Sequence, residues 1–172
     1  MALAYFITFT TYGTWLHGSE KGLGSVYWEH SEYGAEFVEP DAVREMEARG
    51  AMSQSVYTMD ARRREVVRDA VVALAQEKGW RLLAMHVRSN HVHVVIWAER
   101  DPGRLMSDLK ARASRELTAA GFENAQRRRW TRHGSTRHLF TNEEVEKKIK
   151  YTLDEQGTPM AVYDGRNERR AK

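Results

Sequence analysis

The feature that most constrains the fold is a pair of apolar segments, WRLLAMHV and HVHVVIWAE, separated only by Arg88, Ser89 and Asn90. Both segments are short and rich in residues that favour strands, whereas the residues between them favour a turn. Two such segments joined this tightly predict a β-hairpin, whose strands must run antiparallel. We therefore expect an antiparallel sheet in which these two strands are neighbours.

The segments around this hairpin predict a regular alternation of strands and helices. AYFITFTTY has the period of two that is typical of a half-buried strand. Capping residues and apolar stripes mark the helices, and the expected elements are strands at 4–12, 80–87, 91–99 and 136–140 and helices at 60–79, 101–121 and 141–156. The order is βαββαβ, followed by a last helix. This order predicts a ferredoxin-like or RRM-like α+β fold, an antiparallel sheet with helices on one face plus a C-terminal helix.

Length and breaks in the pattern predict the domain organisation. The 172 residues are expected to form a single domain over 1–172. The stretch at about 17–59 has no sustained period and is too long for an ordinary connection, so it is predicted to be an insertion, with PDAVREMEARG as one helix. The basic end, at about 165–172, is predicted to be a mobile tail.

Composition excludes several kinds of site. The chain has no cysteine, which excludes disulfides and thiolate metal sites and makes a cytoplasmic location the expectation. No apolar run approaches the roughly 20 residues that span a bilayer, and the first residues lack the pattern of a signal peptide, so no membrane partner is expected. The formal net charge is only +3, but arginine triplets at 62–64 and 127–129 are local patches that can attract phosphate. Solvated surface arginines would give the same pattern.

Two histidines one residue apart, His91 and His93, lie in the second strand of the hairpin. Residues two apart point to the same face of a strand, so both imidazoles share a face. Val92 and Val94 point to the other face. Two imidazoles can bind one divalent cation if a third ligand or substrate oxygens complete the site. The spacing alone leaves a metal site and a structural pair open. His86 is expected opposite His93, where it could be a further ligand or support one. A strand histidine with a local hydrogen bond is the favoured interpretation.

The last predicted helix carries a tyrosine outside its apolar stripe. Tyr151 lies roughly 145° around the helix from that stripe, so its side chain is expected to be displayed, with Lys147 and Lys148 one turn before it. Glu155 projects with the tyrosine, whereas Gln156 points nearer the buried side. Either could be a third metal ligand; helical geometry favours Glu155, and Gln156 stays open because helix ends fray. An amphipathic surface tyrosine would give the same pattern.

Together these motifs resemble those of the single-tyrosine HUH transposases, the group of small insertion-sequence transposases and REP-associated tyrosine transposases. The resemblance rests on FTTYGTW, AMHVRSNHVHVVIWA, TRHGSTRHLF and YTLDEQG, in this order, and covers most of the chain outside the insertion. It implies that His91 and His93 bind Mg²⁺ or Mn²⁺ and that Tyr151 attacks a DNA phosphate. One position departs from the insertion-sequence pattern, because Glu155 stands four residues after the tyrosine, where that pattern has glutamine.

The resemblance implies an enzyme that nicks and rejoins single-stranded DNA through a 5′-phosphotyrosine, on ends that bear a hairpin, as a monomer or a homodimer. Basic residues are expected to contact the DNA, and the candidates are Lys147, Lys148, Arg128, Arg129, Arg132 and Arg137. Three alternatives remain: an RRM-like nucleic-acid-binding module, a metal-dependent hydrolase in which Tyr151 is structural, and a domesticated hairpin-DNA binder that does not cut.

Overall fold

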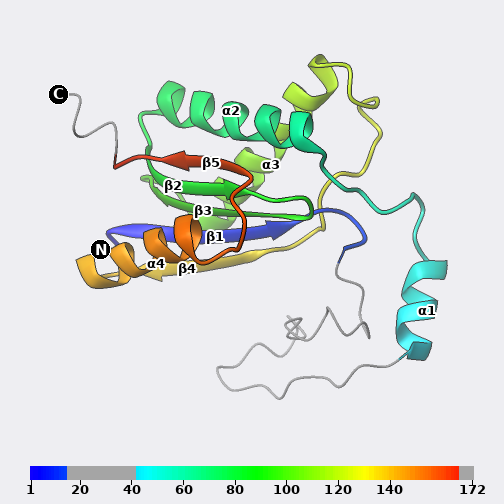
Figure 1. Ribbon diagram of the computed structural model, residues 1–172, viewed down its shortest axis with the longest axis horizontal. Helices are drawn as coiled ribbons and strands as arrows, with labels where there is room; N and C mark the ends of the chain where they lie inside the picture. Colours follow the sequence, from blue (N-terminus) through cyan, green and yellow to red (C-terminus); the bar gives the residue numbers. More distant parts are fainter. Residues whose placement is uncertain (15–41, 167–172) are drawn as a thin grey trace.

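An antiparallel five-stranded sheet organises the chain in the computed structural model, which describes residues 1–14 and 42–166 (Figure 1). The strands of these ranges are β1 (Ala4–Thr10), β2 (Arg81–Val87), β3 (His91–Trp97), β4 (Ser135–Leu139) and β5 (Ala161–Asp164). The helices are α1 (Ala42–Gly50), α2 (Ala61–Lys78), α3 (Pro102–Ala119) and α4 (Asn142–Asp154). The strand order is β4-β1-β3-β2-β5, with every neighbouring pair antiparallel. The predicted α+β class and the β2–β3 hairpin are therefore confirmed.

Local signals fix where the helices begin. Asp60 and Asp101 cap α2 and α3 by accepting hydrogen bonds from backbone N–H groups three residues later. Thr141 and Glu144 form a complete capping box at the start of α4, in which each side chain accepts a hydrogen bond from the backbone N–H of the other residue. The first turn of α4 is thus held firmly, and its direction across the sheet is set from that end.

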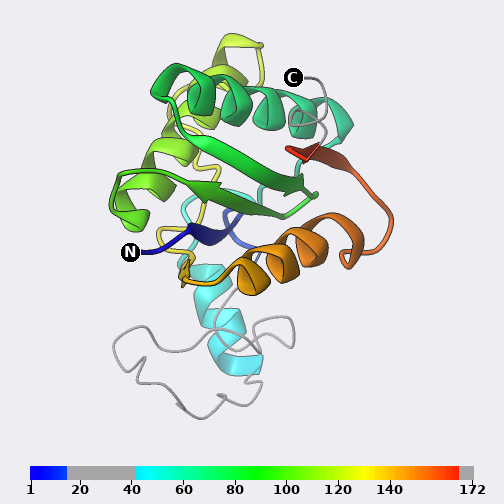
Figure 2. The same cartoon turned by 90° about the vertical axis from the view of Figure 1, so that its left-hand side faces the viewer.

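The two faces of the sheet are covered by different helices (Figure 2). α2 and α3 pack on one face, where Phe9 and Val94 belong to the larger of two cores. α4 packs on the opposite face, where Val95 and Leu153 belong to the smaller core. The adjacent residues Val94 and Val95 of β3 thus point into different cores, as the strand period predicts. The expectation of helices on one face holds for α2 and α3, and α4 extends the fold on the other.

β5 is an edge strand that the sequence pattern does not predict, because it is only four residues long and follows closely on Pro159. It pairs with β2, and just after it the backbone N–H of Gly165 donates to the Leu83 carbonyl oxygen at 3.0 Å. A Cβ atom at Gly165 would lie 2.5 Å from the Leu82 carbonyl oxygen, so this close approach requires glycine. The start of the predicted tail at 165–172 is therefore tied to the sheet, and residues 167–172 lie outside the described ranges.

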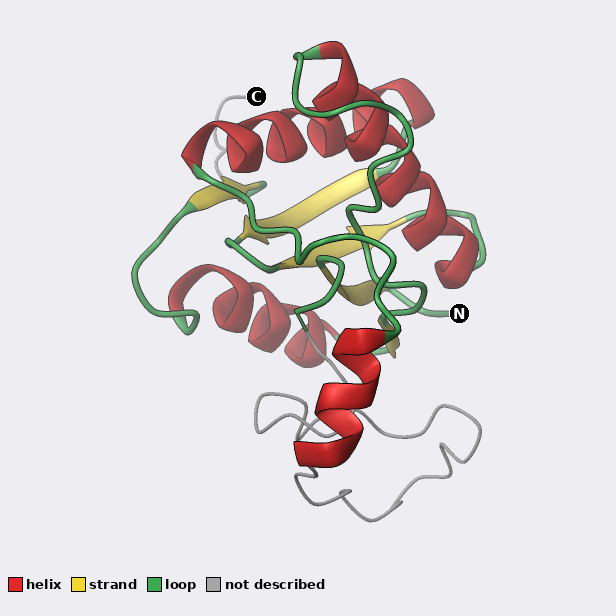
Figure 3. Cartoon of the chain, turned by 90° about the vertical axis from the view of Figure 1, so that its right-hand side faces the viewer, coloured by secondary structure: helices red, strands yellow, loops and turns green. Residues whose placement is uncertain are grey.

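The predicted insertion at about 17–59 falls partly outside the described residues, which omit 15–41. The helix predicted in PDAVREMEARG is confirmed as α1, which projects from the rest of the structure (Figure 3). The side chains of Tyr57 and Met59 are buried in the larger core, and their backbone N–H groups donate to the carbonyl oxygens of Tyr12 and Ser89. The chain therefore joins the packed body by Tyr57, before the predicted limit of the insertion. None of the helices in these ranges is both long and apolar enough to cross a membrane.

Candidate active site

β3 places His91 and His93 on the face of the sheet that α4 covers. His93 is paired with Thr8 of β1 on one side and with His86 of β2 on the other. The shared face predicted for the two histidines is confirmed, because Val94 points into the core on the opposite side. Their ring centroids are 4.8 Å apart, which brings both imidazoles within reach of one ion.

Each of the two imidazoles uses its Nδ1 for a hydrogen bond to a neighbouring side chain. Nδ1 of His91 lies 2.7 Å from Oδ1 of Asn90, which can only accept, so Nδ1 carries the proton and Nε2 keeps its lone pair. Nδ1 of His93 lies 2.7 Å from Oγ1 of Thr8. When this hydroxyl accepts the hydrogen bond, Nδ1 carries the proton and Nε2 of His93 keeps its lone pair. A partner on the second nitrogen is the usual support of a metal-binding histidine.

Burial keeps both histidines neutral. It lowers the pKa of His93 to about 3, with a smaller contribution from the neighbouring His91. The pKa of His91 is also lowered, first by burial and then by the positive charge of Arg88. Because only the neutral imidazole can bind a metal ion, these shifts keep the pair ready for a cation at neutral pH.

Tyr151 lies against the sheet and is not displayed on the outer side of α4. Its ring is half-buried, with its centroid 5.6 Å from that of His93 and 5.9 Å from that of Phe6. Nζ of Lys148 lies 4.9 Å from the centroid of the Tyr151 ring and 4.6 Å from that of Phe6. The expectation of a displayed side chain is wrong because α4 contacts the sheet with a wider face than its apolar stripe alone.

The end of α4 decides which residue after the tyrosine reaches the histidines. The helix ends at Asp154, two residues before the predicted end, so Gln156 no longer follows the helical rotation. Its Nε2 donates to the backbone oxygen of Tyr151 at 3.1 Å, and its side chain lies close enough to His91 and His93 to raise the pKa of each, against the larger effect of burial. Since the amide nitrogen donates to the backbone, the amide oxygen is the atom available as a ligand.

Glu155, the residue that helical geometry favours as third ligand, faces solvent. Its side chain is 51% exposed, and its carboxylate lies 3.9 Å from Nζ of Lys150. The prediction for Glu155 assumed a helix that continues past it, whereas it occupies the C-cap position. Of the two candidates, the structure brings Gln156 to the histidines.

The donor set can hold a divalent cation and leave open positions on it. Among the described residues, no group of three His, Cys, Asp or Glu side chains could hold a metal ion. The side chains of His91, His93 and Gln156 do lie close together, and they offer two imidazole nitrogens and one amide oxygen. A divalent cation held by such mixed nitrogen and oxygen ligands keeps its remaining positions for water or substrate oxygens. The residues present therefore fit a divalent cation, and the predicted Mg²⁺ or Mn²⁺ stays a proposal.

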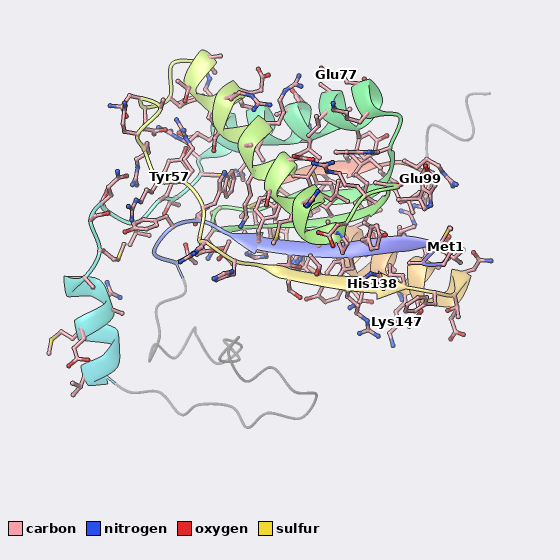
Figure 4. The ribbon with its side chains drawn as sticks, turned by 180° about the vertical axis from the view of Figure 1, so that it is seen from behind. Met1, Tyr57, Glu77, Glu99, His138 and Lys147 are labelled. Atoms are coloured by element: carbon pink, nitrogen blue, oxygen red, sulfur yellow. The ribbon has the colours of Figure 1, made fainter. Side chains whose placement is uncertain are left out.

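The six basic residues predicted to contact DNA differ in accessibility. Lys148 lies at the site itself. Arg129 is only 2% exposed, and its guanidinium donates to the Phe122 carbonyl oxygen at 2.7 Å and to Thr118 Oγ1 at 3.0 Å. The prediction for Arg129 is therefore wrong, because a run of arginines does not reveal which one turns inward to hold its own loop. The other four residues are exposed, namely Arg128, Arg132, Arg137 and Lys147. Lys147 is labelled in Figure 4.

Four residues of the site are absent from the sequence predictions. Phe6 stacks on His93 with ring centroids 5.5 Å apart, and Thr8 and Asn90 hold the histidine nitrogens. Arg88 carries the positive charge nearest His91 along the turn. Asn90 and Arg88 could have been found from their place beside the histidines, whereas Phe6 and Thr8 depend on the register between β1 and β3.

One family model and one solved structure are similar to this chain. A family model described as "Transposase IS200 like" matches residues 53–151, a range that includes both histidines and ends at Tyr151. A solved structure described as the REP-associated tyrosine transposase bound to a REP hairpin is similar at a TM-score of 0.47 and 11% sequence identity. That alignment covers 87% of this chain and 64% of the other, so this chain spans just under two thirds of its length. No curated protein matches the sequence significantly.

Proposed function

The chain belongs to the family of IS200-like transposases, and on that premise we propose that it nicks and rejoins single-stranded DNA through a covalent bond to Tyr151. The observation that carries the proposal is the meeting of Tyr151 with His93. Their ring centroids are 5.6 Å apart although one residue lies on α4 and the other on β3. A tyrosine with only a packing role has no need of a buried, neutral histidine pair beside it.

We propose that His91, His93 and Gln156 bind one Mg²⁺ or Mn²⁺ ion. When bound, the ion would polarise the scissile phosphate and offset the negative charge that builds on its oxygens. The protein contributes two neutral imidazoles whose orientation is fixed by Asn90 and Thr8. It also contributes the amide oxygen of Gln156, whose nitrogen is engaged by the backbone of the helix that carries the nucleophile.

Tyr151 supplies the nucleophile in this proposal. Its Oη forms a bond to phosphorus while the bond from phosphorus to the 3′ oxygen of the preceding nucleotide breaks. The phenol gives up its proton, and the 3′ oxygen takes one and leaves as a hydroxyl. Because the 5′-phosphotyrosine keeps the energy of the phosphodiester, attack by a 3′-hydroxyl can rejoin DNA without ATP. Nζ of Lys148, 4.9 Å from the tyrosine ring, is placed to pair with a phosphate oxygen.

The position of Tyr151 supports a single-stranded substrate. Its half-buried ring lies between α4 and the sheet, where a flexible strand can enter more easily than a rigid duplex. Exposed basic residues on β4 and α4, including Arg137 and Lys147, can follow the backbone away from the site. A hairpin next to the cleaved position, and action as a monomer or a homodimer, belong to the same proposal.

A nucleic-acid-binding protein without catalysis is the alternative function. It would use the same sheet and basic residues, and it would not need a tyrosine, two histidines and an amide to converge. The presence of all four groups favours the enzyme.

A covalent adduct with DNA separates the two functions. The protein is incubated with single-stranded oligonucleotides, with and without a hairpin, in Mn²⁺, and is then run on a denaturing gel. We expect an adduct that resists denaturation, is lost in a chelator and forms best on hairpin-bearing strands. Binding without an adduct at any sequence would favour the alternative.

A further inference from the structure

The connection between α4 and β5 carries Gln156 and has little packing of its own. Residues 154, 155 and 157–160 are exposed, so few apolar contacts hold this segment in place. Gln156 nevertheless has to stay against the histidines if it is to act as a ligand. The contacts that fasten the connection to the sheet therefore decide how well the site is formed.

His86 fastens this connection at both ends with a single imidazole. It lies on β2 opposite His93, and its side chain is completely buried. Nδ1 lies 3.1 Å from the carbonyl oxygen of Thr152, and Nε2 accepts the backbone N–H of Met160 at 3.0 Å. Because Nε2 is the acceptor, Nδ1 carries the proton and donates to Thr152, so only one tautomer satisfies both bonds.

The two backbone groups that His86 engages bracket the proposed ligand. Thr152 directly follows the nucleophile on α4, and Met160 directly precedes β5. Arg88 adds a third hold, since its Nη1 donates to the Thr158 carbonyl oxygen at 3.1 Å. His86 of β2 and Arg88 of the following turn therefore hydrogen-bond to the backbone before and after Gln156.

We propose that His86 is a positioning residue, which holds Gln156 in place by fastening the last turn of α4 and the start of β5 to β2. It touches no reacting atom and acts through the segment between Thr152 and Met160. The proposal rests on the proposed function, because it assigns His86 a role toward the metal ligand. Both nitrogens of the buried imidazole are satisfied by backbone groups at the two ends of the segment that carries Gln156.

Two substitutions separate positioning from packing. His86→Phe keeps a flat ring and removes both hydrogen bonds, whereas His86→Gln keeps one donor and one acceptor separated by a single atom. We expect His86→Phe to weaken Mn²⁺ binding by about 10- to 100-fold, as loss of support around a metal ligand typically does. We expect His86→Gln to recover much of that loss. Binding is measured by titration calorimetry with Mn²⁺ alone.

Hydrogen exchange gives a second readout that needs neither metal nor DNA. In metal-free His86→Phe, the backbone amides from 155 to 160 should exchange faster, while those of β1 and β3 stay protected. Leu117→Ala, in the core on the other face, is the matched control for lost stability. It should lower the melting temperature and leave both Mn²⁺ affinity and exchange at 155–160 unchanged. Equal Mn²⁺ affinity in folded His86→Phe and the unchanged protein would overturn the proposal.

If His86→Phe does not fold, the proposal is tested on the unchanged protein by hydrogen exchange. Gln156 and Met160 lie in the same short segment, so a metal ion bound by Gln156 should also stabilise the hydrogen bond from Met160 to His86. Saturation with Mg²⁺ should therefore slow exchange of the Met160 amide. No slowing at saturation would overturn the positioning role. Failure of the proposed function looks different, because the unchanged protein would then bind no Mn²⁺ or form no adduct.

Discussion

The two faces of the sheet use the same strands for different purposes. On the face covered by α2 and α3, β1 and β3 contribute Ile7, Phe9 and Val94 to a closely packed apolar core. On the face covered by α4, the same strands contribute Thr8 and His93 to a site with polar partners. The apolar cluster on that second face is much smaller and lies beside the site.

This difference indicates that stability and chemistry are largely separate in this fold. The larger core provides most of the buried apolar area, so its loss should unfold the protein without changing the site in molecules that remain folded. On the second face, hydrogen bonds from Thr8, Asn90 and backbone groups hold the histidines, and such bonds contribute little net stability but fix geometry. Changes on each face should therefore have effects of different kinds, and the following substitutions test that division.

The largest expected effect is the loss of adduct formation in Tyr151→Phe. Removing one hydroxyl group deletes the proposed nucleophile and leaves the ring contacts with Phe6 and His93 in place. We expect no covalent adduct on a denaturing gel and an unchanged melting temperature. Tyr5→Phe, the same deletion on the other face, should keep the adduct. An adduct in Tyr151→Phe would show that another residue attacks the DNA.

His91→Ala should remove most of the metal affinity. It deletes one of the two proposed imidazole ligands, so we expect Mn²⁺ binding to weaken by at least about 100-fold, more than loss of a supporting residue would cause. Adduct formation should fall with it, measured at a fixed Mn²⁺ concentration. His138→Ala, at an exposed histidine of β4, is the matched control and should bind Mn²⁺ normally. Normal binding by His91→Ala would place the ion elsewhere.

Leu109→Ala should have the opposite effect to the substitutions in the site, because it should lower stability and leave the site intact. Leu109 lies on α3 and is completely buried in the larger core. We expect the free energy of unfolding to fall by about 2–5 kcal/mol, measured by urea denaturation. The folded fraction should bind Mn²⁺ with unchanged affinity. A parallel loss of affinity would mean that the two faces are coupled through the sheet.

Acid should destabilise the metal-free protein through the second face. Burial lowers the pKa of His93 to about 3 in the folded chain, below its ordinary value of 6.5. The unfolded chain therefore takes up a proton first, so the free energy of unfolding is highest above about pH 6.5 and declines as pH falls toward about 3. His93→Gln, which has no titrating group, should show a shallower decline in urea denaturation at a series of pH values. Identical slopes would contradict this origin.

The smallest effect is expected for Glu155→Ala. Its carboxylate faces solvent and Lys150, so Mn²⁺ affinity should stay unchanged, and an exposed ion pair of this kind contributes roughly 0–1 kcal/mol to stability. The paired substitution Gln156→Ala should lower the affinity clearly. A loss in Glu155→Ala and none in Gln156→Ala would reverse the choice of third ligand.

Patterns of short period made most of the fold predictable. The alternation in β1 and β3 and the capping residues of α2, α3 and α4 are local signals, and the structure follows them. β5 was not predicted, because a strand of four residues is too short to show a clear pattern of its own and forms by pairing with β2. The placement of α4 on the second face depends on packing, which no local pattern encodes.

The site was predictable where one element carries it and less so where several meet. The shared face of His91 and His93 follows from strand geometry alone. The choice between Glu155 and Gln156 depends on where α4 ends, and helix ends are the least certain part of any pattern. The burial of Arg129 depends on the loop that surrounds it, and the contacts of Phe6 and Thr8 depend on cross-strand register.

The late position of β5 along the chain has a consequence for solubility. The residues of β2 are mostly buried, and β5 pairs with its outer edge (Figure 1). In any chain that stops before Ala161 this edge of β2 would be unpaired, and an unpaired edge can pair with other chains. During synthesis the same edge stays open until β5 emerges. We therefore expect shortened versions of this protein to aggregate less when they keep β5 through Gly165.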